Sequence, residues 1–402
     1  MESKLAAIVG ALSFLFITGN SFAQESGFHE AGAGLSGGLG HSRPDSIFDH
    51  PENSFGLFLD GALTYEDELS AQFTSAEAVF QSRFAPEWLG FAVLEANDEE
   101  TRLSELAASY YGFGGNTSIG AGRFFLDFGK QMQTHVHDIS TPSRPAVLRE
   151  YLGEEASGDG VQLDHWAELG SESTLRFSLA AFDAFESHSH GVGEHEEDDG
   201  EHEHGGEIDQ ESLGFGARLT TTTHLSDGVL QLGASYRGVP EYTALSDEVG
   251  IADVGGLSND LVGVDLTYAW GGHGHGHGDC WSVGGEYLSF SGDLSAEEDE
   301  ALFRIDVYRS RVSGWYAFAD HQYEDDKSYG VMLSAFEHPE AGGEEDLETT
   351  LYHTWNLSDA TRVRLALVHR DSGEDGDSLA GVLQLTGFFG DHGHAHAHAH
   401  SH

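Results

Sequence analysis

The chain has 402 residues and a formal net charge of −51, and it contains 25 histidines and one cysteine, Cys280. A single cysteine cannot close an internal disulfide, so a disulfide-stapled fold is excluded. The strong negative charge argues against nucleic acid or another polyanion as a partner, and it suits cations or a surface that stays soluble in salt.

The N-terminus has the features of a secretory signal peptide. Lys4 supplies a positive charge, the apolar core runs from Leu5 to Thr18, and Ser21-Phe22-Ala23 offers small residues where a signal peptidase reads. Residues 1–23 are therefore predicted to be removed, and residues 24–53 to form a flexible leader. No later stretch reaches the roughly 18 apolar residues of a spanning helix. The rest of the chain is expected to be either soluble or a membrane protein built from strands.

From Ser54 onward, hydrophobicity alternates with a period of two residues. For example, Val262 and Val264 alternate with Gly263 and Asp265. Strands of about ten residues with one apolar and one polar or small face are typical of a transmembrane β-barrel. The predicted fold is all-β, a transmembrane antiparallel barrel of about 16 strands, within a range of roughly 14 to 18. The predicted strands are 54–66, 70–82, 87–96, 101–113, 117–128, 158–168, 173–184, 211–223, 228–237, 259–270, 279–290, 301–323, 328–337, 347–357, 361–370 and 378–389.

This strand order sorts the connections between the two ends of the barrel. With the N-terminus in the periplasm, the long connections fall outside and the short ones inside, as in bacterial outer-membrane barrels. The long ones are 129–157, 185–210, 238–258, 291–300, 338–346 and 371–377. The span 301–323 is too long for one simple strand and is expected to contain part of a loop or a hairpin. A soluble sandwich or a β-solenoid is the alternative, but sandwich strands are usually shorter and no fixed repeat period is present.

The connection 129–157, which is the third external loop in the predicted strand order, carries a candidate metal site. His135 and His137 are separated by one residue, which on an extended segment places both imidazoles on one side, where they can chelate zinc, copper or nickel. Asp138 could add a carboxylate or orient a histidine. A polar loop with incidental histidines is the plainer interpretation, because two adjacent histidines are a weak signal.

Three further segments are rich in histidine. The connection 186–210 combines five histidines with ten carboxylates, and glycines keep it flexible, so it suits loose and rapidly exchanging divalent cations. Strand order places the other two, the turn 272–278 and the tail 391–402, in the periplasm. Because neutral imidazole is the ligand, metal occupancy should fall below about pH 6.5. The candidate ligands in these segments are His188, His190, His195, His202, His204, His273, His275, His277, His392, His394, His396, His398, His400 and His402.

The stretch 122–163 resembles a family of porin-like bacterial outer-membrane barrels associated with zinc acquisition. The residues that carry the resemblance are Gly122-Arg123-Phe124 with Gly129, His135-x-His137, Arg144-Pro145, Tyr151-Leu152-Gly153, and Gly158-Asp159-Gly160-Val161-Gln162-Leu163. Histidine-rich loops are a further shared feature. The chain departs from barrels that end on an aromatic residue, because thirteen residues follow Phe389.

These observations support one main hypothesis and two alternatives. The main hypothesis is an outer-membrane porin-like channel for zinc or a related divalent cation, with the ion as cargo and no other cofactor required. Its partners would be outer-membrane lipid, divalent metal ions, a periplasmic metal-binding protein and further copies of the chain in a homotrimer. The alternatives are a general cation-preferring diffusion porin of a salt-adapted bacterium and a surface metal-binding barrel without transport. No G-x-S-x-G, H-E-x-x-H or P-loop motif is present, so no enzymatic activity is expected.

Overall fold

The computed structural model describes residues 53–66, 68–97, 101–114, 116–153, 155–188, 208–210, 212–244, 254–271, 279–299, 304–324, 326–339, 345–358, 360–373 and 376–390. The strands in these ranges are β1 (Asn53–Tyr65), β2 (Leu69–Ala85), β3 (Trp88–Ala96), β4 (Thr101–Tyr110), β5 (Thr117–Phe125), β6 (Glu155–Glu168), β7 (Ser173–His188), β8 (Ile208–Gln210), β9 (Gly214–Leu225), β10 (Gly228–Ala244), β11 (Val254–Gly271), β12 (Cys280–Asp299), β13 (Arg304–Glu324), β14 (Lys327–Glu337), β15 (Glu345–Ser358), β16 (Thr361–Ser372) and β17 (Gly376–Gly390). Two short helices, the 3-10 helix η3 (Val136–Asp138) and the α-helix α2 (Ala146–Leu152), lie between β5 and β6.

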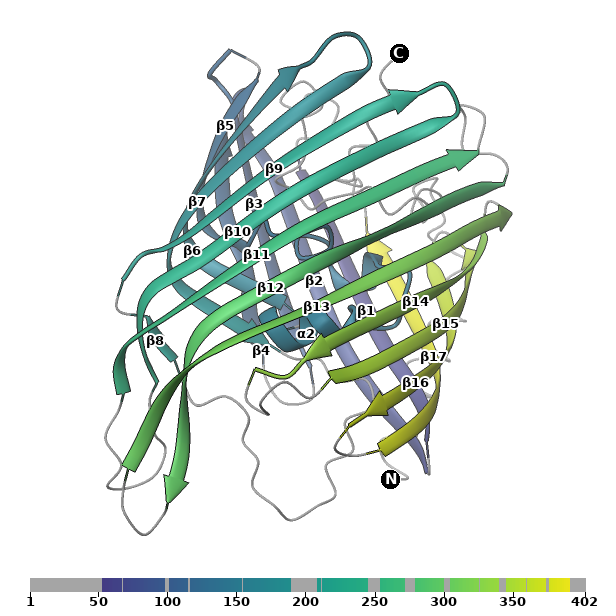
Figure 1. Cartoon of the computed structure of the whole chain (residues 1–402). Coiled ribbons are helices and arrows are strands. Elements are labelled where there is room, and N and C mark those ends of the chain that lie inside the picture. The colour runs from purple at the N-terminus through teal and green to yellow at the C-terminus, as the bar shows by residue number, and fades with distance from the viewer. Residues whose placement is uncertain are drawn as a thin grey trace.

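The strands close into one antiparallel barrel (Figure 1). β1 pairs with β2 on one side and with β17 on the other, which closes the ring. β8 and β9 both pair with β10 and occupy one position, so the seventeen strand segments form a sixteen-stranded barrel. The predicted fold class and strand number are confirmed, and each predicted strand overlaps one of the sixteen positions. A closed ring excludes the sandwich and the solenoid.

Side chains alternate between the lumen and the outer face, as the period of two predicts. Along β1, Phe58 and Asp60 are buried toward the lumen, whereas Phe55 and Tyr65 are exposed on the outside. The outer face is rich in exposed leucines and aromatic residues, which is the lipid-facing pattern of a membrane barrel. No helix among the described residues is long and apolar enough to cross a membrane.

The prediction for the segments 291–300 and 301–323 is wrong. β12 continues to Asp299, and β13 runs unbroken from Arg304 to Glu324 in register with it, with Leu294 opposite Tyr308. The two strands extend beyond their neighbours at the lower left of Figure 1. The segment is long because this hairpin projects past the rim and goes on forming its own hydrogen-bond ladder there.

The connection between β5 and β6 folds into the barrel, as α2 inside the ring of strands shows (Figure 1). We call residues 126–153 the inward loop. Two glycines permit its turns, Gly129 with φ 58° and Gly153, which ends α2, with φ 74°. The sequence pattern did not predict α2. This helix begins directly after Pro145, and a proline is tolerated at the start of a helix because its missing N–H is not needed there.

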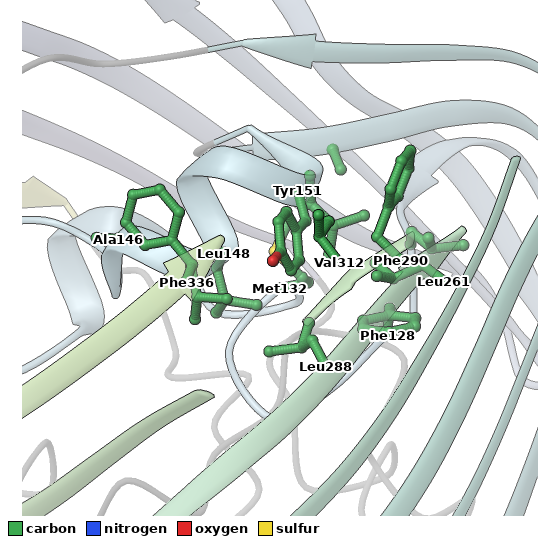
Figure 2. Close-up of a cluster of buried hydrophobic side chains, with 14 of the residues drawn as sticks. Phe128, Met132, Ala146, Leu148, Tyr151, Leu261, Leu288, Phe290, Val312 and Phe336 are labelled. Atoms are coloured by element: carbon green, nitrogen blue, oxygen red, sulfur yellow. The ribbon is translucent and has the colours of Figure 1, made fainter. Parts of the chain in front are cut away.

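An apolar cluster attaches the inward loop to one wall of the barrel. Figure 2 shows Leu148 and Tyr151 of α2 facing Leu288, Val312 and Phe336 of β12, β13 and β14. Leu148 is completely buried. Burying such side chains inside the barrel stabilises the loop by about 1.5–3 kcal/mol for each fully buried residue. A loop with this many buried apolar contacts has a fixed position in the lumen.

Polar contacts also attach the same loop to β10, β14 and β15. Arg149 Nη2 donates to Glu348 Oε2 of β15 at 2.6 Å, and the backbone N–H of Val147 donates to Ser334 Oγ of β14 at 3.0 Å. Nearer the start of the loop, the N–H of Gly129 donates to Ser235 Oγ of β10 at 2.9 Å. These contacts and the apolar cluster hold the loop against the arc of strands from β10 to β15.

Candidate metal site

The site begins with two glutamates at inward positions of neighbouring parts of the barrel. Glu77 lies on β2 and Glu105 on β4, and both are buried. Their strand periodicity directs them into the lumen, between apolar or small inward neighbours such as Val79 and Ala107. Buried carboxylates are costly without a partner, so each needs a cation or a hydrogen-bond donor in the lumen.

The inward loop brings His135 and His137 against these carboxylates. His135 has extended backbone dihedrals and precedes η3, so the residues are not on one extended segment as predicted. The imidazoles nevertheless lie side by side, with ring centres 5.4 Å apart and planes at 16°. The expectation that both rings face the same way is therefore met by a different backbone conformation.

Three donor atoms converge on one point. Glu77 Oε1 lies 3.0 Å from His135 Nδ1 and 3.2 Å from His137 Nδ1. The three ligand atoms all lie within 4.8 Å of one another. Ligands at about 2.0–2.1 Å from a tetrahedral zinc ion stand roughly 3.3 Å apart, so the two nitrogen–oxygen distances fit such a centre.

Glu77 faces both imidazoles inside the barrel. When the histidines are protonated, Glu77 Oε1 pairs with His135 Nδ1 and His137 Nδ1. A metal ion that replaces these protons would meet the same three ligand atoms. Two imidazoles and one carboxylate are a known zinc ligand set that leaves one coordination position open.

Neighbouring side chains fix the orientation of the two histidines. Phe58 of β1 stacks on His137 with ring centres 3.6 Å apart. Asp138 Oδ2 lies 3.4 Å from His137 Nε2, and Glu105 Oε2 lies 3.3 Å from His135 Nε2. Each imidazole thus has one nitrogen toward Glu77 and the other toward a second carboxylate, which is how ligand histidines are usually oriented.

Two arginines of β16 hold the backbone of this segment. Arg362 Nη1 donates to the carbonyl oxygen of His137 at 2.7 Å, and Arg364 Nη2 donates to the same oxygen and to that of Ile139, each at 2.6 Å. Both guanidinium groups are buried. They satisfy carbonyl groups that would otherwise be orphaned inside the barrel.

The carboxylates also control protonation of the histidines. Burial lowers the pKa of His137, but the charges of Asp138 and Glu77 outweigh burial and raise this pKa to about 10. Burial likewise lowers the pKa of His135, and the charges of Glu77 and Glu105 raise it well above its ordinary value. Without a metal ion, the histidines are therefore protonated and balance the carboxylates, and a metal ion must displace these protons.

The structure brings together only part of the predicted metal set. His135, His137 and Asp138 meet in the lumen, with Asp138 beside a histidine rather than at the shared point. His188 is the last residue of β7, opposite Glu155. The other predicted ligands, His190, His195, His202, His204, His273, His275, His277, His392, His394, His396, His398, His400 and His402, lie outside the described residues.

Sequence reasoning missed both glutamates. Glu77 and Glu105 lie at positions that the strand period assigns to the lumen, and an ionisable residue at such a position could have been a signal. Nothing in the sequence alone pairs them with a loop that follows some thirty to sixty residues later, because that contact depends on the inward path of the loop.

The chain was compared with known proteins. No protein-family model and no curated protein matches it by sequence. Solved structures do match: Pseudomonas putida OprB with a TM-score of 0.54 and 10% identity, over 88% of this chain and 99% of that one. An anion-selective porin from Comamonas acidovorans gives 0.53 and 12%, over 84% and 99%. A trimer form of Vibrio cholerae OmpT gives 0.52 and 11%, over 84% and 99%.

The fold is that of bacterial outer-membrane porins. At this low identity the likeness concerns the fold and not the cargo. A closed barrel with an apolar outer face needs a membrane, and the predicted location in the bacterial outer membrane is confirmed on this basis. The zinc-associated family that the sequence resembles is not among these structures.

Proposed function

We propose that this porin-like barrel passes zinc, or a closely related divalent cation, across the outer membrane. The ion would bind in transit to His135, His137 and Glu77 in the lumen. Asp138 and Glu105 would hold the imidazoles in place. The proposal includes no catalytic step, and the metal ion is cargo rather than a resident cofactor.

One observation carries the proposal. Glu77 Oε1 lies 3.0 Å from His135 Nδ1 and 3.2 Å from His137 Nδ1, and the ligand atoms of these three residues all lie within 4.8 Å of one another. In the metal-free protein the imidazole protons occupy this position, and a zinc ion can replace them there. An open fourth position allows the ion to leave, which a transport site requires.

The histidine-rich segments extend the proposal beyond the lumen. The connection 186–210 would collect ions outside, and the segments 272–278 and 391–402 would receive them in the periplasm. A periplasmic metal-binding protein would then take up the ion. A homotrimer is the assembly that we propose, and one of the structural neighbours is described as a trimer form.

Zinc titration of the purified full-length protein by calorimetry tests the site. The wild type should bind several zinc ions at pH 7.5, and the double variant His135→Ala with His137→Ala should lose one of them. The matched control is His165→Ala with His224→Ala, two histidines on the strands β6 and β9 outside the site. We expect the loss of both imidazole ligands to weaken zinc binding at that site by at least about 100-fold. Changing only a group that orients a ligand already costs about 10–100-fold in metal affinity.

Unchanged stoichiometry and affinity in the lumen double variant would refute the metal site. Heat-resistant migration of the folded barrel on gels verifies that each variant is folded. With folding verified, loss of zinc in the lumen variant alone assigns the ion to His135 and His137.

Two observations favour other functions of the same barrel. The fold is shared with outer-membrane porins, which favours a general diffusion porin. The inward loop contacts strands around the ring, which favours a barrel without transport. Planar-bilayer recordings separate the three. A general porin conducts equally well with both histidines replaced, and a closed barrel shows no current although it binds zinc. The proposed channel conducts a current that zinc modulates only when both histidines are present.

A further inference from the structure

A cavity of about 40 Å³ lies next to the candidate metal site. Its polar lining consists mainly of Glu105, Ser109, Ser118, Gln133, Gln162 and Asp164. A water molecule needs roughly 10–15 Å³ of such volume, so the cavity has room for a small cation with part of its water shell. Glu105 lines this cavity and also contacts the candidate metal site, because its Oε2 lies 3.3 Å from His135 Nε2.

Two amide oxygens in this lining lack partners. Gln162 Nε2 donates to Asp164 Oδ2 at 2.9 Å, and Gln133 Nε2 donates to the carbonyl oxygen of Phe125 at 3.4 Å. These bonds fix the orientation of both amides, since only the NH₂ group can donate. The Oε1 atoms of Gln133 and Gln162 are buried and have no hydrogen-bond partner among the described residues. Both side chains are more than nine-tenths buried, with 7% and 6% exposed.

Two carboxylates lie in the cavity lining, and each has a cationic partner. Asp164 pairs with Arg176 at 2.5 Å, and Arg176 also contacts Asp127 at 2.7 Å. Glu105 Oε2 lies 3.3 Å from His135 Nε2. Oxygen atoms of amides, hydroxyls and carboxylates are ligands for divalent cations such as Mn²⁺ and, more weakly than imidazole, Zn²⁺.

The cavity also lies in the direction that an ion must take. β4 carries Glu105 near its middle and Ser109 near its end, and the connection to β5 follows. Ser118 is the second residue of β5, at the same end. The cavity therefore extends from the histidines toward the end of the barrel with the short turns, which the strand order assigns to the periplasm.

We propose that this cavity is a second, oxygen-lined site for a divalent cation. Its place on the transport route rests on the proposed function, whereas its ability to bind a cation does not. The ion would move from the imidazoles to the oxygen ligands by way of Glu105, which both sites share. Weaker ligands after stronger ones let an ion leave, as conduction through several sites requires.

Crystals of the full-length protein soaked in MnCl₂ or ZnCl₂ test the proposal by anomalous scattering. Mn²⁺ should give a peak in the cavity beside Gln133, Gln162 and Glu105 in the wild type. The double variant Gln133→Met with Gln162→Met keeps the side-chain length but removes both oxygens, and the peak should disappear. The matched control is Gln81→Met, which changes a buried inward glutamine of β2 outside the cavity and should leave the peak in place.

The possible outcomes keep the two proposals separate. A wild-type crystal with zinc at His135 and His137 but no Mn²⁺ in the cavity overturns the second site alone. Mn²⁺ in the cavity with no zinc at the histidines supports the second site and overturns the proposed function. Zinc entry into vesicles should slow about tenfold in the glutamine double variant, in line with changes of supporting groups at metal sites, and the same rate as in Gln81→Met would remove the cavity from the route.

Discussion

Glu77 decides what the two predicted histidines can do. His135 and His137 alone would be two basic side chains on a loop. Glu77 contributes the oxygen that both Nδ1 atoms approach, at 3.0 and 3.2 Å. It lies on a strand almost sixty residues earlier in the chain, so the site exists only after the loop has entered the barrel.

The pKa values of these histidines predict how metal binding depends on pH. The pKa of His137 is raised to about 10 and that of His135 well above its ordinary value. Both are protonated at pH 7, so zinc must displace close to two protons, and its affinity should rise as pH increases toward 10. Exposed histidines, with ordinary values near 6.5, should lose metal only below about that pH.

Calorimetry in two buffers of different ionisation heat measures the protons released. At pH 7 we expect close to two protons for the zinc ion that the double alanine variant loses. Release of no protons at this step would contradict the assigned protonation.

In the metal-free protein, the stability of the docked loop changes with pH in the opposite direction to the zinc affinity. The raised values stabilise the docked loop below about pH 6.5, and this contribution is lost as pH rises through about 10.

At the scale of elements, the inward loop is the part that differs most from a simple connection. Its apolar side packs on β12, β13 and β14, and its polar side meets β2, β4 and β16. The apolar packing therefore sets the position of the metal site, although none of its residues is a ligand. A substitution on the apolar side of the loop should therefore lower zinc affinity at the polar side.

Leu148→Ala tests this coupling. Leu148 is completely buried against the barrel wall, and removing such a side chain costs about 2–5 kcal/mol. The barrel should stay folded, while the inward loop becomes sensitive to protease and zinc affinity falls. Limited proteolysis followed by mass spectrometry identifies cleavage between β5 and β6. Leu213→Ala, at an exposed position, is the control, and equal loop cleavage in both variants would show that α2 packing does not hold the loop.

At the scale of the whole molecule, the barrel provides one face to lipid and one to the lumen. Closure satisfies the backbone hydrogen bonds of every neighbouring strand, which a membrane requires. The outward leucines need only be apolar, whereas many inward positions are polar and buried, with several paired to one another. Stability in the membrane and cargo binding thus depend on opposite faces of the same strands.

Substitutions along β15 test which face meets lipid. Leu351 is an outward residue near the middle of the strand, and Leu357 lies outward near its end. Arginine at the bilayer midplane costs roughly 2–4 kcal/mol, and near the interface about 0–1 kcal/mol. Leu351→Arg should therefore lower the unfolding free energy in lipid vesicles much more than Leu357→Arg, as denaturant titration measures. Equal losses would contradict the assigned membrane position.

The period of two in the hydrophobic pattern determined the barrel, its strand number and the face of each residue. These properties are local, because a strand that exposes one side to lipid must repeat every second residue. Strand length at the rim was less predictable, as β12 and β13 show, because the hairpin ladder continues where lipid no longer selects the pattern. The sequence also singled out His135 and His137. Only the tertiary structure supplied Glu77, Glu105 and the cavity beyond them, because the ligands come from distant segments whose meeting depends on how the loop packs inside the closed barrel.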